Sequence, residues 1–108
     1  MRTTYRILRP NGQHEAREVE WPADPTYHQI ERLIKPLLGG EDLEHVNVTY
    51  RGERADMFVC ENGKLFNMPR NETATGIYRT DRVRPGRDPE SVSYIVGVAI
   101  VFDRKVWT

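Results

Sequence analysis

The sequence predicts an α+β fold: an antiparallel or mixed sheet of five to six strands packed on one main helix, plus one short helix. Three observations predict it. Short segments of alternating or wholly apolar residues are separated by turns rich in Gly and Asn, as in β-hairpins. One stretch has apolar residues at helical spacing. The length of 108 residues suits a single domain, here residues 1–108.

The composition indicates a globular protein without a strong overall electrostatic field. Hydrophobic residues make up 38% and charged residues 30% of the chain, and the formal net charge is zero. A neutral chain is not drawn as a whole to nucleic acid or to an anionic membrane. One cysteine, Cys60, excludes an intrachain disulfide and favours a reducing compartment. No apolar run has the length of a signal peptide or a membrane span, so we expect a cytoplasmic protein without a membrane partner.

The first two strands are expected at Thr4–Arg9 and Glu15–Trp21. Between them lies the pair Asn11-Gly12, in which both residues tolerate the positive φ of a tight hairpin turn. The second strand alternates in character, which suits a strand with one face in water.

The main helix is expected at Pro25–Leu38, with Asp24 as its N-cap and proline at its first position. Pro36 is expected to kink the last turn or to end the helix early, and the two glycines that follow end it in any case. Its apolar residues form one continuous stripe: Tyr27, Ile30, Leu33, Ile34, Leu37 and Leu38.

Two further strands are expected at Leu43–Arg51 and Asp56–Glu61, joined by a turn at residues 51–54. The pair Asn62-Gly63 then predicts a second hairpin turn that leads into a short fifth strand at Lys64–Asn67.

A bend at Pro69 precedes a short helix at Asn71–Arg79. Asn71 is the expected N-cap, and Glu72 interacts favourably with the helix dipole. The segment Asp81–Ser91 reads as a polar loop.

The last strand is expected at Val92–Phe102. It has no polar residue from Ile95 onward, which indicates a central strand buried on both faces. One of its faces is small at Gly97 and Ala99, so we expect the main helix to pack there.

Catalytic and metal chemistry are not predicted. The three histidines and Cys60 lack the spacing of metal ligands, and no cofactor motif occurs. His45 could lie across a hairpin from Cys60 as a base for a thiolate. The favoured interpretation is that Cys60 is a small buried hydrophobe.

Two candidate binding surfaces remain. One is a small polar pocket beside Pro69, between the short helix and the sheet edge, although turn and cap chemistry explains many of the same residues. Its residues are Asn67, Arg70, Asn71, Glu72, Thr75 and Tyr78. The other is the loop 79–87, whose arginines could bind phosphates or could simply be solvated. These arginines are Arg79, Arg82, Arg84 and Arg87.

From Leu43 to Phe102 the chain resembles a family of small uncharacterised proteins of bacteria and their phages, known only as a domain of unknown function. The positions that carry this resemblance, together with a later Ile-Val-Gly strand, are Asn62, Gly63, Pro69, Asn71, Ala74 and Thr75. It implies a cytoplasmic bacterial or phage-derived protein, an accessory of a mobile element, and supplies no catalytic residues. Residues Met1–Glu41 lie outside the pattern.

These observations predict a non-enzymatic binding or interaction module. Its partner would be another protein or a second copy of the chain, reached through an exposed strand edge. Two alternatives stay open. One is a nucleic-acid accessory protein that uses the loop 79–87, and the other is a small-molecule binder with a pocket near Asn67, Asn71 and Thr75.

Overall fold

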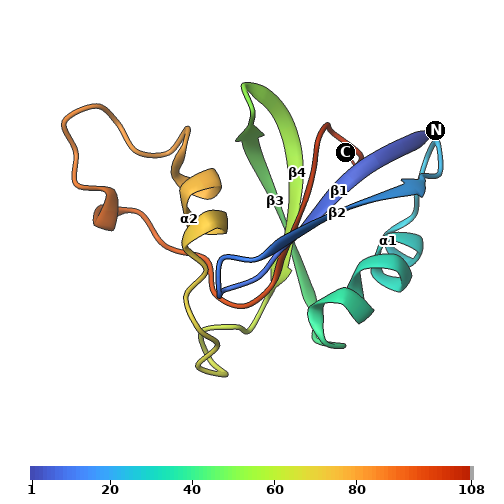
Figure 1. The fold of residues 1–108 in the computed structure, drawn as a ribbon, viewed down its shortest axis with the longest axis horizontal. Coiled ribbons are helices and arrows are strands. Elements are labelled where there is room, and N and C mark those ends of the chain that lie inside the picture. The colour runs from blue at the N-terminus through green and yellow to red at the C-terminus, as the bar shows by residue number, and fades with distance from the viewer. Residues whose placement is uncertain (108) are drawn as a thin grey trace.

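The structure, a computed structural model, describes residues 1–107 and contains a five-stranded antiparallel sheet with helices on both faces (Figure 1). The predicted α+β fold class is confirmed. The elements are β1 (Arg2–Leu8), β2 (His14–Glu20), α1 (Tyr27–Ile34), the 3₁₀ helix η1 (Lys35–Leu38), β3 (Leu43–Tyr50), β4 (Glu53–Cys60), α2 (Glu72–Arg79), the 3₁₀ helix η2 (Pro89–Ser91) and β5 (Ala99–Phe102).

The strand order is β2-β1-β5-β4-β3, so β5 joins two hairpins that are separate in sequence. Ile100 of β5 lies opposite Ile7 of β1 on one side and Phe58 of β4 on the other. All four residues of β5 are buried. The prediction that the last strand is central and covered on both faces is therefore confirmed.

The main helix covers the face of the sheet that carries Ile100 and Phe102. Ile30 and Ile34 of α1 are fully buried against these side chains and Phe58. Each such side chain contributes about 1.5–3 kcal/mol by leaving water. The prediction that this helix packs over Gly97 and Ala99 is wrong.

The small face is covered by α2 instead. Ala74 of α2 is fully buried in a second core with Ala99 and Val101. The predicted strand is also shorter than expected, because Gly97 has a φ of 74° and interrupts the extended backbone before β5. A Cβ at Gly97 would lie 2.8 Å from the Sδ atom of Met68, so the chain before β5 packs tightly under another segment.

The main helix starts two residues later than predicted. Thr26, not Asp24, is the N-cap. Its hydroxyl accepts from the Gln29 N–H at 3.2 Å, and the Gln29 side chain accepts from the Thr26 N–H at 2.9 Å. This reciprocal pair satisfies two helix-end donors at once. The α-helix gives way to η1 around Pro36, and Gly39, with a φ of 78°, ends it as predicted.

The predicted fifth strand and its hairpin turn are wrong. Residues 61–67 form a run of turns in which the Phe66 N–H donates to Asn62 O at 3.1 Å. The Met68 N–H likewise donates to Gly63 O at 3.0 Å. Because these donors are bonded within the turn, the segment cannot use them in a β-ladder. We call residues 61–67 the Leu65–Phe66 turn, after the two side chains at its tip.

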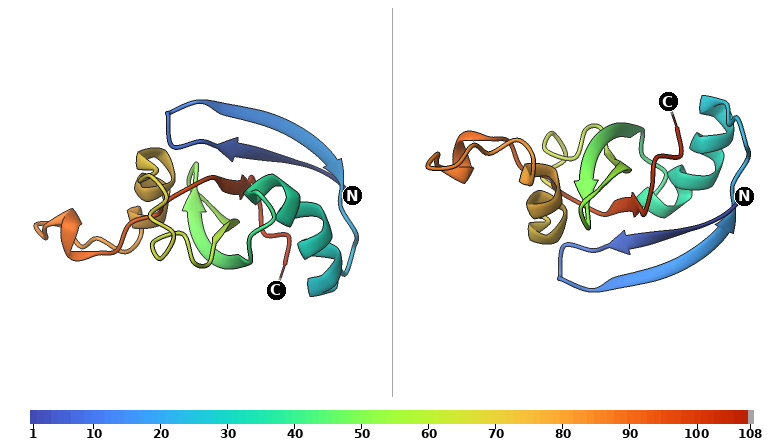
Figure 2. Two further views of the ribbon diagram at one scale, coloured as in Figure 1. Left: turned by 90° about the horizontal axis from the view of Figure 1, so that it is seen from below. Right: turned by 90° about the horizontal axis from the view of Figure 1, so that it is seen from above.

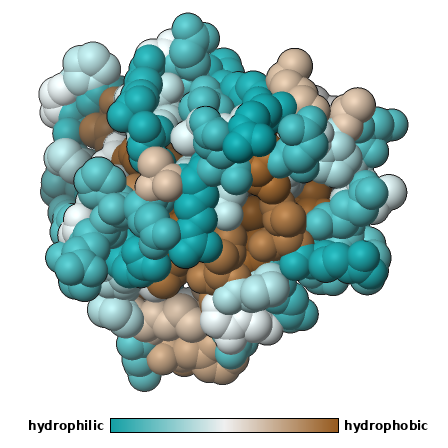
Figure 3. All heavy atoms as spheres, turned by 45° about the vertical axis from the view of Figure 1, so that its right-hand side comes forward, coloured by the Kyte–Doolittle hydropathy of each residue, from teal (hydrophilic) through white to brown (hydrophobic). Residues whose placement is uncertain are grey.

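Most of the surface is polar, but apolar side chains reach it in places. Figure 3, which turns the α1 side forward, shows apolar atoms in a hollow rimmed by polar ones. The partly buried apolar residues that border the core under α1 are Val19, Leu37, Val98 and Trp107. Within residues 1–107, no helix is both long and apolar enough to cross a membrane.

Candidate functional site

Asn71, a predicted binding residue, points into the protein. Its Oδ1 accepts from the Ala74 N–H at 3.0 Å, which confirms the predicted N-cap. Its Nδ2 donates to Leu8 O at 2.9 Å and to Gly97 O at 2.8 Å. The side chain is fully buried, and each polar atom already has a protein partner.

Thr75 also points inward. Its hydroxyl accepts from the Ile95 N–H at 2.9 Å and donates to Ile95 O at 3.3 Å. Asn71 and Thr75 therefore bind α2 to the backbone before β5, and both lie beneath the surface of the predicted pocket.

Arg70, Glu72 and Asn67 lie at the surface. The Arg70 guanidinium pairs with Glu72 at 2.6 Å and with Glu90 at 3.0 Å, and it lies 4.9 Å from the centre of the Tyr94 ring. The Lys64 ammonium is 4.2 Å from the centre of the same ring. These groups border a shallow hollow of about 360 Å³, lined by Lys64, Asn67, Met68, Arg70, Tyr94 and Val96.

Tyr78 lies on the wall of a larger groove of about 500 Å³, between β3 and the segment 93–96. Lys64, Tyr94 and Val96 line both this groove and the hollow, so the two adjoin. The structure thus separates the predicted pocket residues into a buried pair, Asn71 and Thr75, and four residues that lie nearer the surface.

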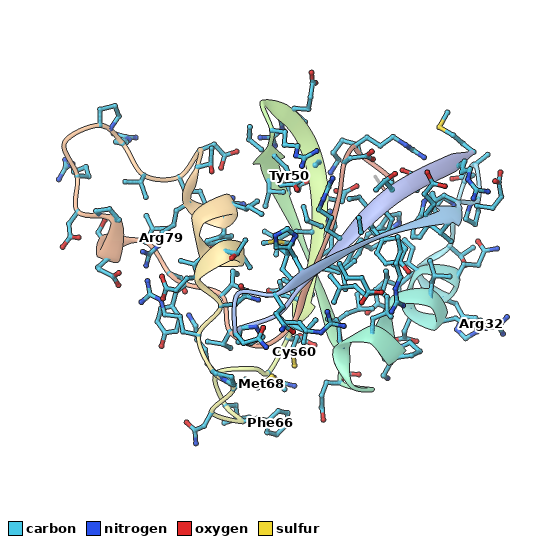
Figure 4. The ribbon with its side chains drawn as sticks, in the orientation of Figure 1. Arg32, Tyr50, Cys60, Phe66, Met68 and Arg79 are labelled. Carbon is cyan, nitrogen blue, oxygen red and sulfur yellow. The ribbon has the colours of Figure 1, made fainter. Side chains whose placement is uncertain are left out.

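Arg79 and Arg82, two of the predicted phosphate-binding residues, hold the loop to the body. Arg79 donates to Val92 O at 2.7 Å and pairs with Glu90 at 3.2 Å (Figure 4). Arg82 donates to Asn47 O on the edge of β3 at 2.7 Å.

Glu90 links Arg70 and Arg79. Hydrogen bonds from Arg70 and then Arg79 lower the pKa of Glu90 from 4.5 to about 2. This carboxylate therefore stays charged over most of the acidic range and fixes the base of the loop.

Arg84 and Arg87 are the exposed pair of the loop. The Arg87 N–H donates to Arg84 O at 3.0 Å, and Gly86 between them has a φ of 80°. Proline at the second position and a left-handed glycine at the third are typical of a type II turn. This turn brings the two guanidinium-bearing residues close together at the tip of the loop.

A cluster around the buried carboxylate of Asp56 was not predicted from the sequence. Asp56 is fully buried, and its Oδ2 accepts from the Val106 N–H at 2.6 Å and the Trp107 N–H at 2.9 Å. Its Oδ1 lies 2.5 Å from His45 Nε2 and also contacts the Lys105 ammonium. Asp56 thus holds the segment 105–107 against the sheet.

Burial opposes the charge of Asp56, but the hydrogen bonds from Lys105, His45 and the two backbone N–H groups outweigh it. They lower the pKa of Asp56 below its usual value. The signal in the sequence was the alternation of β4, which places Asp56 on the same strand face as Phe58.

Cys60 is a buried free thiol, as the favoured interpretation predicted. It lies opposite Leu43 in the β3–β4 register, whereas His45 lies opposite Phe58. Burial raises the pKa of the Cys60 thiol. The suggested pairing of His45 with Cys60 is therefore not formed. Within residues 1–107 no group of three or more His, Cys, Asp or Glu side chains is placed to hold a metal ion.

The Leu65–Phe66 turn presents the most exposed pair of adjacent apolar side chains. Leu65 is 75% exposed and Phe66 is 52% exposed. In Figure 4 Phe66 lies at the lower edge of the molecule, beyond the ends of the strands. The sequence did not indicate this feature, because its pattern predicted a strand at Lys64–Asn67.

Three features are therefore candidates for a functional role: the Leu65–Phe66 turn, the Arg84–Arg87 pair and the Asp56 cluster. The first two are exposed and the third is buried. Comparison of the chain with protein-family models, with curated proteins and with solved structures found no match.

Proposed function

We propose that the protein is a non-enzymatic interaction module that binds a partner protein through the Leu65–Phe66 turn. The observation that carries the proposal is the exposure of Leu65 and Phe66, at 75% and 52%. Single apolar residues on a surface are ordinary, but neighbouring ones with polar surroundings are typical of protein contacts. Aromatic anchors of this kind often dominate binding energy.

The backbone of the turn supports this proposal because it is held in one shape. Its internal hydrogen bonds include Asn67 N–H to Lys64 O at 3.2 Å. At its base, a Cβ on Gly63 would lie 2.6 Å from Val96, so the turn packs closely on the chain below. A preformed surface loses less conformational entropy on binding than a flexible one.

The surroundings of the turn indicate the chemistry of the partner. Lys64 and Arg70 both lie over the ring of Tyr94, and Lys64 and Tyr94 line the same groove as Leu65. An apolar pocket with an acidic rim would complement this surface, and its charge would chiefly increase the association rate.

The structural roles of the potentially reactive groups support a non-enzymatic function. The Cys60 thiol is buried and its pKa is raised, which disfavours the thiolate that a nucleophile requires. Both oxygens of Asp56 accept hydrogen bonds from the segment 105–107 and so hold it in place.

The test is capture of partners by immobilised protein, compared among three chains. The double variant L65S/F66S removes both apolar anchors, and L33S removes a partly exposed leucine from α1 as a control. We expect a partner that binds the parent and L33S but not L65S/F66S. Circular dichroism should show that all three are folded. Capture of the same proteins by L65S/F66S, or capture of none by the parent, would contradict the proposal.

A second candidate function is nucleic-acid binding, and the observation that favours it is the exposed Arg84–Arg87 turn. Two arginines side by side can contact adjacent phosphates. The variant R84A/R87A should weaken a salt-dependent gel shift of DNA or RNA, whereas R32A on α1 should not. Arg82 is unsuitable for this test because it supports β3. No shift by the parent at low salt would exclude this function.

We also propose that the protein is cytoplasmic and related to the small bacterial and phage proteins that it resembles. A single cysteine suits a reducing compartment. Several residues that carry the resemblance have folding roles, including the close packing at Gly63, the junction at Asn71 and the buried Ala74. Such roles would be needed by any protein of the same fold.

A further inference from the structure

The two edge strands of the sheet differ in how their outer backbone groups are used. On β3, Arg82 donates to the carbonyl oxygen of Asn47, so that edge is partly covered. On β2, the odd-numbered residues face β1, as the bonds Arg9 N–H to Gln13 O and Trp21 N–H to Met1 O show at the two ends of the pairing. The even-numbered residues His14, Ala16, Glu18 and Glu20 therefore direct their N–H and C=O groups outward.

No described segment lies beyond β2. Figure 2 shows it in both views as the outermost strand, with β1 on its inner side and no ribbon on its outer side. It has seven residues and contains neither proline nor glycine, so its outer edge is regular over its whole length. An edge of this kind is a template for a further strand.

We propose that β2 pairs antiparallel with β2 of a second copy of the chain, about a two-fold axis through Ala16. Ala16 then lies opposite its own counterpart, and His14 lies opposite Glu18 of the second copy. The outward backbone groups of these residues face one another, as a continuous ladder requires. The two five-stranded sheets become one sheet across the dimer.

The side-chain charges select this register. Within one chain Arg17 pairs with Glu15 at 2.7 Å. With the axis at Ala16, Glu15 of each copy also lies opposite Arg17 of the other, on the face that α1 covers. His14 lies opposite Glu18 on the other face. Opposite charges placed directly across a pair of strands, as with Glu15 and Arg17 here, stabilise it, and like charges destabilise it.

Neighbouring registers do not have this complementarity. An axis through Arg17 places that residue opposite itself, and an axis through Glu15 or Glu18 places two carboxylates opposite each other. Charged residues commonly protect an edge strand from unwanted partners. In β2 the same charges would exclude most partners and admit a second copy in one register.

Charge reversal tests this register with a specific outcome. The parent should form a dimer as its concentration rises, measured by sedimentation velocity at low salt. R17E places carboxylate opposite carboxylate twice, and E15R places guanidinium opposite guanidinium twice, so each variant alone should stay monomeric. An equimolar mixture of R17E and E15R should form a heterodimer, because both contacts between residues 15 and 17 then join opposite charges.

A backbone variant tests the strand pairing itself. A16P removes an N–H that faces away from β1, so the β1–β2 ladder is preserved and the dimer should be lost. A16T keeps the N–H and should still dimerise. Circular dichroism and thermal melting show whether each variant is folded. If A16P does not fold, the mixture of R17E and E15R decides whether the strands pair.

Three results would overturn this inference: a parent that is monomeric at every concentration, an R17E variant that dimerises like the parent, or a dimer that L65S/F66S abolishes. The last result would assign self-association to the Leu65–Phe66 turn. A dimer that survives L65S/F66S and is lost in R17E supports the β2 interface whether or not the proposed partner binding holds.

Discussion

The side-chain amide of Asn71 donates to the carbonyl oxygen of Leu8 at 2.9 Å and so joins the start of α2 to the end of β1. The same Nδ2 atom donates to Gly97 O, just before β5. Meanwhile Oδ1 caps the helix through the Ala74 N–H. One buried side chain thus connects a helix, an inner strand and the approach to the central strand.

Replacing Asn71 with alanine should destabilise the protein more than the loss of an ordinary N-cap does. Loss of the cap contributes ~1 kcal/mol, and each buried carbonyl left without a donor adds ~1–3 kcal/mol. We expect N71A to lower the free energy of unfolding by ~3 kcal/mol or more in urea titrations. N71S keeps a cap acceptor and should lose less. A loss of only ~1 kcal/mol in N71A would show that the two carbonyl bonds contribute little.

Ile100 lies in the centre of the sheet and has no exposed surface. I100A should lower the free energy of unfolding by about 2–5 kcal/mol, because it leaves a cavity under α1. The matched variant V98A, at a half-buried position outside β5, should cost less. Equal effects of the two changes would contradict a central role for β5.

Asp56 should make stability depend on pH. Its pKa in the folded protein is lowered, so its contribution is present at neutral pH and is lost as the pH falls below ~4, where the unfolded chain takes up the proton first. D56N should remove part of this dependence and loosen the segment 105–107. Acrylamide quenching of tryptophan fluorescence should then increase, because Trp107 is held by Asp56. An unchanged acid transition in D56N would contradict this assignment.

Glu90 should control the mobility of the loop 80–93. Its folded pKa of about 2 lies below the usual value of 4.5, so the anchor weakens as the pH falls between these values. E90Q should weaken it at neutral pH and increase the rate of tryptic cleavage after Arg87. Arg84 is a poor site because Pro85 follows it. The control E53Q, in the β3–β4 hairpin, should be cleaved at the parental rate.

Local signals predicted the parts of the fold that depend on neighbours in sequence. The hairpin turn near Gly12, the Asn71 cap and the stop at Gly39 were predicted from residues within a few positions. The apolar run at β5 also predicted its central place, because a strand between two others is buried on both faces.

The predictions that proved wrong concern segments whose structure depends on contacts with residues distant in sequence. Asn62-Gly63 has the composition of a hairpin turn, but packing of Gly63 on Val96 and of Met68 on Gly97 favours a compact turn there. The face that α1 covers could not be chosen from the size of Gly97 and Ala99, because α2 competes for the same surface. The alternation of β4 indicates that Asp56 is buried, but its partners in the segment 105–107 lie about fifty positions away and have no local signal.

The place of β5 has a consequence for synthesis of the protein. The β1–β2 and β3–β4 hairpins each emerge from the ribosome earlier, but in the sheet they meet only through residues 99–102. Until those residues emerge, the inner strands β1 and β4 have unpaired edges and uncovered apolar faces. Nascent chains that stall before residue 99 should therefore be substrates for chaperones, and release of β5 should be the step that ends this exposure.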